Sequence, residues 1–271
     1  MQKVLKKYRY SLILLRELVI TDFKLRYQNS ALGYLWSLMK PLFLFAIMYV
    51  VFVKFLKIGA GIEHWPVAML MGMVMWTFFQ EITKGGLKAI VNRGDLLRKI
   101  NFPKYIVILS GTASAFINLL LNMVVITVFM IANKVDLSSL ALLSPLLVVE
   151  LTLFGLGIAF FLSAVYVKLR DVEYIWDVVM QGLFYGSAIM FPISRISEVS
   201  VEFARVLLLN PIAQVISDLR YILTNQDMQT LTTLSDGKVW LALVPIAISI
   251  ATFVFGAWYF RKKSPYFAEF A

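Results

Sequence analysis

Long apolar runs separated by short polar segments fill this chain between residues 35 and 260. A helix that crosses the hydrocarbon core of a bilayer needs about 20 mostly apolar residues. Six segments are expected to form such helices: 35–56, 66–88, 105–133, 138–167, 174–193 and 239–260. Segment 66–88 is the least apolar, because Glu81, Lys84 and Lys88 predict that its helix continues into the cytosol or turns toward a polar cavity. The pattern predicts an all-α membrane protein with six transmembrane helices.

The composition agrees with a membrane protein. Of the 271 residues, 60% are hydrophobic and only 15% are charged, and the mean hydropathy is +0.79. The chain has no cysteine and a single histidine, His64, so we expect neither disulfides nor a metal site. Its net charge of +10 does not predict nucleic-acid binding, because basic residues of membrane proteins concentrate in cytoplasmic loops.

The basic residues are distributed unequally between the two sides of the predicted bundle. One side, which holds both ends of the chain, carries 19 of the 26 Lys and Arg residues, and the other side carries 7. Cytoplasmic loops are enriched in Lys and Arg. We therefore expect both termini to be cytoplasmic.

Residues 1–30 are expected to form an amphipathic helix at the cytoplasmic membrane surface. Leu12, Leu15, Val19 and Phe23 fall on one side at helical spacing, and basic residues lie elsewhere. The charged pair at positions 16 and 17 interrupts the apolar run, which argues against a secretory signal peptide. A solvated basic tail ahead of the first span is the alternative.

Residues 198–225, between the fifth and sixth spans, are predicted to form an outer re-entrant helical hairpin. Residues 201–209 and 211–223 form two apolar-rich helical segments, each too short to span a bilayer, and Asn210 followed by Pro211 is a typical helix start. The alternative is an extracellular helical cap.

Known catalytic signatures do not occur in the chain. It contains no phosphate-binding G-x-x-x-x-G-K-[ST] loop, no H-E-x-x-H and no G-x-S-x-G. The chain by itself is therefore not expected to be an enzyme or to bind a cofactor. Glu150 and Asp177 are the candidates within predicted spans for an ion or proton relay, and they leave open an ion-coupled transporter that uses Glu150.

The stretch from Lys24 to Pro41 resembles the opening signature of the transmembrane subunits of type 2 ABC exporters, in particular those for lipid-linked polysaccharides such as O-antigen, teichoic acid or capsule. The matching residues are Arg26, Tyr27, Ser30, Leu32, Gly33, Trp36 and Pro41. Gly33 would allow a bend where the chain enters the membrane, and Trp36 would act as an interfacial anchor.

The resemblance covers nearly the whole chain, with residues 31–271 as the transmembrane domain. It implies a homodimer in the bacterial plasma membrane, associated with two copies of a separate cytoplasmic subunit that binds ATP and Mg and hydrolyses the nucleotide. Export of a small lipid or drug is the alternative within the same superfamily. A non-transporting membrane scaffold is a further alternative.

The resemblance also makes residues 92–102 a coupling helix that docks on the ATPase. Leu96 and Leu97 supply an apolar face, and Arg98 and Lys99 lie near the helix C-terminus, where the dipole favours cations. The proposed coupling residues are Arg93, Asp95, Leu96, Leu97, Arg98 and Lys99. The alternative is a basic loop that serves only membrane topology.

Aromatic side chains are expected to guide the glycan, because ring faces can stack on sugars. In the exporters that this chain resembles, spans one and five line the channel of the dimer. The candidate substrate-channel residues are Phe43, Tyr49, Phe52, Tyr174, Phe184 and Tyr185.

Overall fold

The computed structural model describes residues 2–26, 33–100, 102–235 and 237–267. Of the described residues, 81% are helical and none lies in a β-strand. The all-α prediction is confirmed. The longer helices are α1 (Gln2–Arg26), α2 (Trp36–Met48), α3 (Trp65–Ala89), α5 (Tyr105–Ala132), α6 (Ser144–Tyr166), α7 (Val172–Tyr185), α10 (Pro211–Leu223) and α12 (Val239–Lys263). The shorter ones are η1 (Gly33–Leu35), η2 (Tyr49–Phe55), η3 (Val91–Arg93), α4 (Gly94–Lys99), η4 (Ser139–Leu143), α8 (Ile193–Ser197), α9 (Val201–Leu208), α11 (Leu231–Leu234) and η5 (Ser264–Tyr266).

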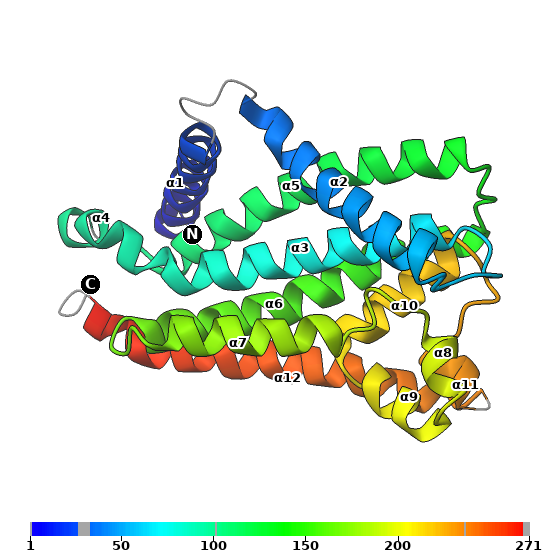
Figure 1. Cartoon of the computed structure of the whole chain (residues 1–271). Helices are drawn as coiled ribbons and strands as arrows, with labels where there is room; N and C mark the ends of the chain where they lie inside the picture. The colour runs from blue at the N-terminus through cyan, green and yellow to red at the C-terminus, as the bar shows by residue number, and fades with distance from the viewer. Residues whose placement is uncertain (1, 27–32, 101, 236, 268–271) are drawn as a thin grey trace.

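The long helices run between two distinct ends of a bundle (Figure 1). The end with α4 and the C-terminus also carries α1, which lies across the direction of the other helices, and the opposite end carries α8, α9 and α11. Helix α1 packs on α5, and its Leu14, Leu15 and Leu18 contact the core. Leu12, which the sequence grouped with Leu15 and Val19, is exposed instead.

Four helical segments are long and apolar enough to cross a membrane: Trp36–Phe55, Tyr105–Ala132, Ser139–Tyr166 and Val239–Tyr266. They correspond to four of the six expected spans. The segment expected at 66–88 does form the 25-residue helix α3, but it is less apolar than these four segments. The reason is its position, since α3 contacts α2, α5, α6, α7 and α10 and therefore does not need a lipid-compatible surface.

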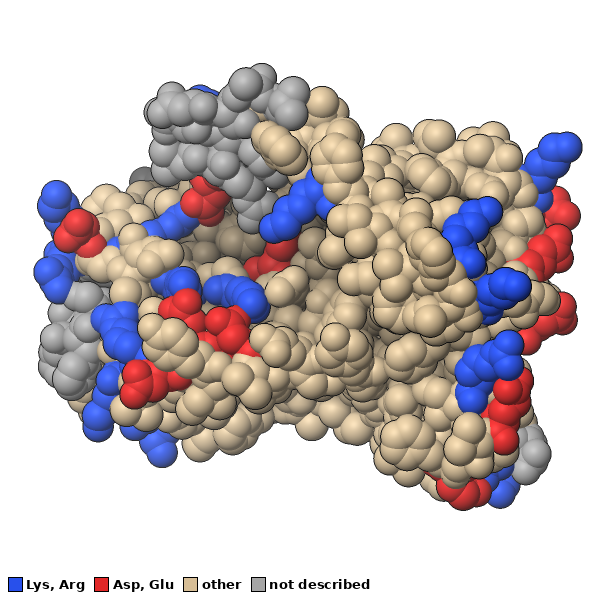
Figure 2. Space-filling view, viewed as in Figure 1, with Lys and Arg blue, Asp and Glu red and all other residues tan. Residues whose placement is uncertain are grey.

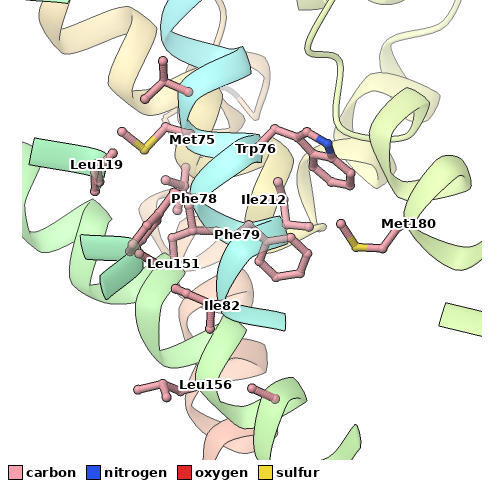
Figure 3. Close-up of a cluster of buried hydrophobic side chains, with 14 of the residues drawn as sticks. Met75, Trp76, Phe78, Phe79, Ile82, Leu119, Leu151, Leu156, Met180 and Ile212 are labelled. Carbon is pink, nitrogen blue, oxygen red and sulfur yellow. The ribbon is translucent and has the colours of Figure 1, made fainter. Parts of the chain in front are cut away.

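Helix α3 forms the centre of the core. Its large side chains interlock with those of four neighbouring helices, as Figure 3 shows. The labelled side chains are Met75, Trp76, Phe78, Phe79 and Ile82 of α3, Leu119 of α5, Leu151 and Leu156 of α6, Met180 of α7 and Ile212 of α10. Because lipid is as apolar as these side chains, close packing rather than escape from water holds such helices together.

Small residues allow the closest helix contacts. A Cβ added to Gly86 of α3 would lie 2.5 Å from the Cβ of Ala159 in α6, and one added to Gly256 of α12 would lie 2.0 Å from the carbonyl oxygen of Gly157 in α6. Side chains of ordinary size do not fit at these distances. Helix α6 is therefore in contact with α3 on one side and α12 on the other.

Helix α7 ends at Tyr185, so the fifth expected span, 174–193, is shorter than predicted. Beyond it, Ala188 has a φ of +50°. The buried guanidinium of Arg220 in α10 donates hydrogen bonds to the carbonyl oxygens of Ala188 at 2.9 Å and Ile189 at 2.6 Å. These bonds stabilise carbonyl groups that a continued helix would have satisfied internally.

Arg220 also connects this turn to the start of α3. Its Nε donates to the carbonyl oxygen of Ala68 at 3.0 Å, and its guanidinium lies 5.0 Å from the ring centre of Trp65. Gly72 provides space for it, because a Cβ there would lie 2.6 Å from Nη2 of Arg220. One side chain thus joins α3, α10 and the segment after α7.

The two helices predicted after the fifth span are present as α9 and α10, with an angle of 103° between them. Asn210 caps α10 as expected, since its side chain accepts a hydrogen bond from the Ile212 amide at 3.1 Å, and Pro211 is the first helical residue. The bend is compatible with a re-entrant hairpin or with a broken span.

Candidate functional site: a polar groove between α2 and α7

Two adjoining hollows form a groove over one face of α3. The larger, of about 700 Å³, lies among α2, α3 and α5, and the smaller, of about 460 Å³, lies between α3 and α7. They share Gln80 and Lys84 of α3. Figure 2 shows basic and acidic side chains gathered in a hollow in the half of this face that carries α4 and the C-terminus.

Polar side chains of α3 and α5 line the larger hollow. Nδ2 of Asn118 donates to both carboxylate oxygens of Glu81, at 2.9 and 3.2 Å. Nδ2 of Asn122 donates to the backbone carbonyl of Asn118 at 2.8 Å. The Oδ1 of Asn118 is buried and has no hydrogen-bond partner among the described residues.

Two ion pairs join α3 to α7 along the groove. Nζ of Lys84 lies 2.6 Å from Oδ1 of Asp177, and Lys88 pairs with Glu173 one turn further along each helix. The spacing of four residues on both helices fits an antiparallel pair. Asp177, which the sequence left open as a relay acid, is therefore the partner of a lysine.

Glu173 also accepts a hydrogen bond from the hydroxyl of Tyr166 at 3.1 Å. The hydrogen bond from Lys88 is the main reason why the pKa of Glu173 lies below its ordinary value, and the Tyr166 hydroxyl acts in the same direction. Glu173 therefore connects the ends of α3, α6 and α7 while it is ionised.

Three residues of the opening signature lie near the groove: Gly33, Trp36 and Pro41. Gly33 has a φ of +50°, which glycine adopts at little cost, and it begins the short helix ahead of α2. Trp36 is 44% exposed and lines the larger hollow together with Pro41. Tyr27 and Ser30, and the side chain of Arg26, lie outside the described residues.

The structure brings together only part of the predicted aromatic set. Phe184 and Tyr185 line the smaller hollow, and Phe184 packs edge-on against Trp76, 5.5 Å away. Phe43 and Tyr174 are exposed and line neither hollow.

The other two predicted aromatics, Tyr49 and Phe52, belong to η2, a π-helical end of the first span, and pack against the core. Residues six and nine positions beyond Phe43 do not share its helix face, because a turn takes 3.6 residues. The role of these aromatics stays a prediction.

The predicted coupling segment lies at the end that carries the C-terminus (Figure 1). Asp95, Arg98 and Lys99 of α4 are exposed, and Leu96 is partly buried against the core. Arg93 pairs with Asp22 of α1, which fixes the approach of α1 to this segment. The side chain of Leu97 lies outside the described ones.

The last predicted site pair, Asn210–Pro211, contacts the end of α7. Nδ2 of Asn210 donates to Oγ of Ser187 at 3.2 Å and to the Gly186 carbonyl at 3.4 Å. Glu150 lies elsewhere, in a pocket that shares no lining residue with the groove. In the described part of the chain, no group of three or more His, Asp and Glu side chains is arranged to hold a metal ion.

Sequence reasoning missed Gln80, Asn118, Asn122 and Gln181 as groove residues. A signal for Gln80 was present, because residues 77, 80, 81, 84 and 88 place a polar stripe on one face of α3. A comparable signal marks the two asparagines of α5, because Ser110, Ser114, Asn118 and Asn122 are each four residues apart and form a polar row on one face of an apolar helix.

Similarity to known proteins agrees with a transporter. The chain is 26% identical over 262 residues to the O-antigen export system permease protein RfbA of Myxococcus xanthus, covering 97% of this chain and 96% of that protein. It is 28% identical over 224 residues to a protein of the same name from Klebsiella pneumoniae, covering 81% and 85%. Residues 14–224 match the family described as ABC-2 type transporter. Since this match covers most of the chain, the protein, a multi-pass membrane protein, belongs to the ABC-2 type transporter family.

Proposed function

We propose that this chain is the membrane subunit of an ABC exporter that moves O-antigen across the bacterial inner membrane. The observation that carries the proposal is similarity over 97% of the chain to a permease named for O-antigen export. The groove supports it, because amide, carboxylate and aromatic side chains line it, and these groups bind sugar hydroxyls and sugar ring faces.

Six crossings complete the proposed topology, with α3 and α7 as the second and fifth. Both ends of the chain lie at the same end of the bundle (Figure 1), as an even number of crossings requires. The excess of Lys and Arg on that side makes it cytoplasmic. The bent pair α9 and α10 then forms the outer re-entrant hairpin.

A homodimer would convert the groove into a closed path. Helix α7 exposes Tyr174, Ile175, Val178 and Tyr185 on one side, next to the open side of the groove. A second copy facing this side would cover both the apolar face and the polar hollow. The substrate in such a channel is an O-antigen chain linked to a lipid carrier.

Energy comes from two copies of a cytoplasmic ATPase subunit that binds ATP and Mg. Helix α4 is the proposed contact, because it projects from the cytoplasmic end with Asp95, Arg98 and Lys99 exposed around the partly buried Leu96. Closure of the ATPase would move α4 and, through Arg93 and Asp22, the surface helix α1.

Export can be tested in a strain that lacks this gene and is complemented with variants. Tyr185→Ala removes a stacking surface from the groove, so we expect less surface O-antigen at unchanged levels of assembled complex. Trp240→Ala, an equally exposed aromatic at the start of α12, is the matched control. Full export by Tyr185→Ala would contradict the groove as the path, and no effect of deleting the gene would contradict the function itself.

Coupling can be tested by co-purification with the ATPase. Leu96→Asp should weaken the complex, because a carboxylate at an apolar contact loses hydration without gaining a partner. Leu169→Asp introduces the same charge in the loop after α6 and should leave the complex intact. Equal recovery of the ATPase with both variants would exclude α4 as the docking site.

A further inference from the structure

A second pocket of about 540 Å³ lies among η4, α6, α10 and α12, toward the end opposite the termini. Its walls contain two acidic side chains, Glu150 and Asp218, and four hydroxyl groups. The hydroxyls belong to Tyr221, Thr230, Thr232 and Ser249. None of the residues that line the export groove lines this pocket.

Two buried acceptor atoms of this pocket lack partners among the described residues. Glu150 is 7% exposed and Ser249 is 1% exposed, and no described group lies within hydrogen-bonding distance of Oε1 of Glu150 or Oγ of Ser249. Asp218 accepts one hydrogen bond, from Nε2 of Gln214 at 2.5 Å. Among the ion pairs of the described residues, none joins a Lys or Arg to either acid. Buried acids in membrane helices are costly unless a cation or donor meets them.

The mouth of the pocket is apolar and faces outward from the bundle. Leu143, Leu146 and Val149 on one side, and Ile246 and Ile250 on the other, are between 37% and 66% exposed. They belong to segments long and apolar enough to cross a membrane. An opening between such side chains admits molecules from the lipid phase.

The extent and volume of the pocket fit a lipid headgroup. Tyr221 and Ile222 also line an adjoining hollow that contains Glu63, Lys134 and Asp136, so the pocket extends from apolar span residues to the charged end of the bundle. A monatomic cation needs only about the room of one water molecule, roughly 30 Å³, which is far smaller than this pocket. The volume lies within the range of about 300–1,000 Å³ that is typical of small-molecule sites.

We propose that this pocket binds a membrane lipid whose headgroup carries a protonated primary amine. The three N–H groups of the ammonium match three acceptors, Glu150, Asp218 and Ser249. The Tyr221 hydroxyl can donate to the lipid phosphate, and so can one of the Thr230 and Thr232 hydroxyls, whose oxygens lie 2.8 Å apart and share a hydrogen bond. The acyl chains lie over the leucine and isoleucine side chains at the mouth. This site does not depend on the proposed export function.

Lipid retention by the full chain tests the proposal. The protein is purified in mild detergent, exposed to equal amounts of phosphatidylethanolamine, phosphatidylcholine and phosphatidylglycerol with the same acyl chains, and analysed by native mass spectrometry. We expect retention of phosphatidylethanolamine to exceed that of the other two roughly tenfold, because the quaternary ammonium of choline has no N–H and the glycerol headgroup has no positive charge. Equal retention of the three lipids by the wild-type chain would overturn the proposal.

Variants locate the effect. Glu150→Gln combined with Asp218→Asn keeps the size of both side chains and should abolish the preference. Glu198→Gln combined with Glu202→Gln removes two exposed carboxylates from the same end of the bundle and should preserve it. A preference that survives the first pair would place the lipid elsewhere and refute the assignment. The assignment would also be refuted if the wild-type chain showed no lipid preference and was stabilised against heat by sodium chloride but not by choline chloride.

Discussion

Helices α3 and α7 are joined by two ion pairs, but they relate to the rest of the chain in opposite ways. In α3, 17 of 25 residues are buried, whereas in α7 only Trp176 and Met180 are buried among 14. Helix α3 is less apolar than the lipid-compatible helices because protein surrounds it. Helix α7 exposes apolar side chains over most of its length.

The difference separates two kinds of constraint on an apolar helix. In α3, the space left by the neighbouring helices limits the size of each side chain, because the side chains of α3 pack against those helices. In α7, polar contacts at its two ends fix its position, and its outer face is free to meet lipid or a second copy. Substitutions in the two helices should therefore have different consequences.

The largest effect is expected in α3. Gly86→Leu places a side chain where a Cβ already meets Ala159 of α6 at 2.5 Å, so we expect destabilisation of about 1–3 kcal/mol or more and poor recovery of folded protein. Gly85→Leu is the matched control, because Gly85 directly precedes Gly86 and a side chain there would extend into open space. Thermal unfolding monitored by size-exclusion chromatography measures both, and equal stability of the two variants would contradict the close α3–α6 contact.

Helix α7 gives the next test, on the face that we assign to the dimer. The chain has no cysteine, so a single introduced thiol reports proximity without background. Val178→Cys should form a disulfide-linked dimer in oxidised membranes, and Val254→Cys on the exposed face of α12 should not. Cross-linking at position 254 but not at 178, read on a non-reducing gel, would move the interface to α12.

A smaller effect is expected when the connection between the two helices is altered. Lys84→Asp places two carboxylates together at the groove and should lower the unfolding midpoint by about 2–4 °C, since this ion pair is partly exposed and contributes about 1 kcal/mol or less. Adding Asp177→Lys restores opposite charges and should recover the midpoint. No recovery in the double variant would show that these residues act separately.

The smallest effect concerns pH. Because the pKa of Glu173 is lowered by its bond with Lys88, the ionised carboxylate stabilises the folded chain above the ordinary pKa of glutamate, and this contribution is lost as the pH falls through the lowered value. Hydrogen exchange of α7 should therefore rise on acidification. Glu173→Gln should show raised exchange at neutral pH and a smaller change with pH, and an unchanged acid response in this variant would assign the effect to another group.

Much of the fold was predictable from local pattern. The apolar runs gave the bounds of α2 with η2, of α3, α5, α6 and α12 to within a few residues, and Asn210 followed by Pro211 correctly predicted the start of α10. The end of α7 was not predictable, because it depends on donors from Arg220, more than 30 residues further along the chain. Local sequence carries no information about such a partner.

The groove was predictable only in part. Phe184 and Tyr185, two of the six aromatic channel candidates, line it, and so does Trp36, which was expected to be an interfacial anchor. Their role in transport stays a prediction. The pairing of Lys84 with Asp177 joins residues 93 positions apart, and Asn118 meets Glu81 across two helices, so neither contact follows from spacing within one helix. Tyr49 and Phe52 lie in the π-helical segment that continues α2, and they pack against the core and do not line the groove.

Arg220 has a consequence for the order of biosynthesis. Its hydrogen bond to the carbonyl of Ala68 joins residues 152 positions apart, and its other acceptors lie in the segment after α7. During translation, α3 and α7 are made before α10, so the carbonyl groups of Ala188 and Ile189 lack these donors until Arg220 has been synthesised. The outer end of the bundle therefore assembles late, after most of the chain has entered the membrane, and a chain truncated before residue 220 would lack the donor that connects its first half to its second.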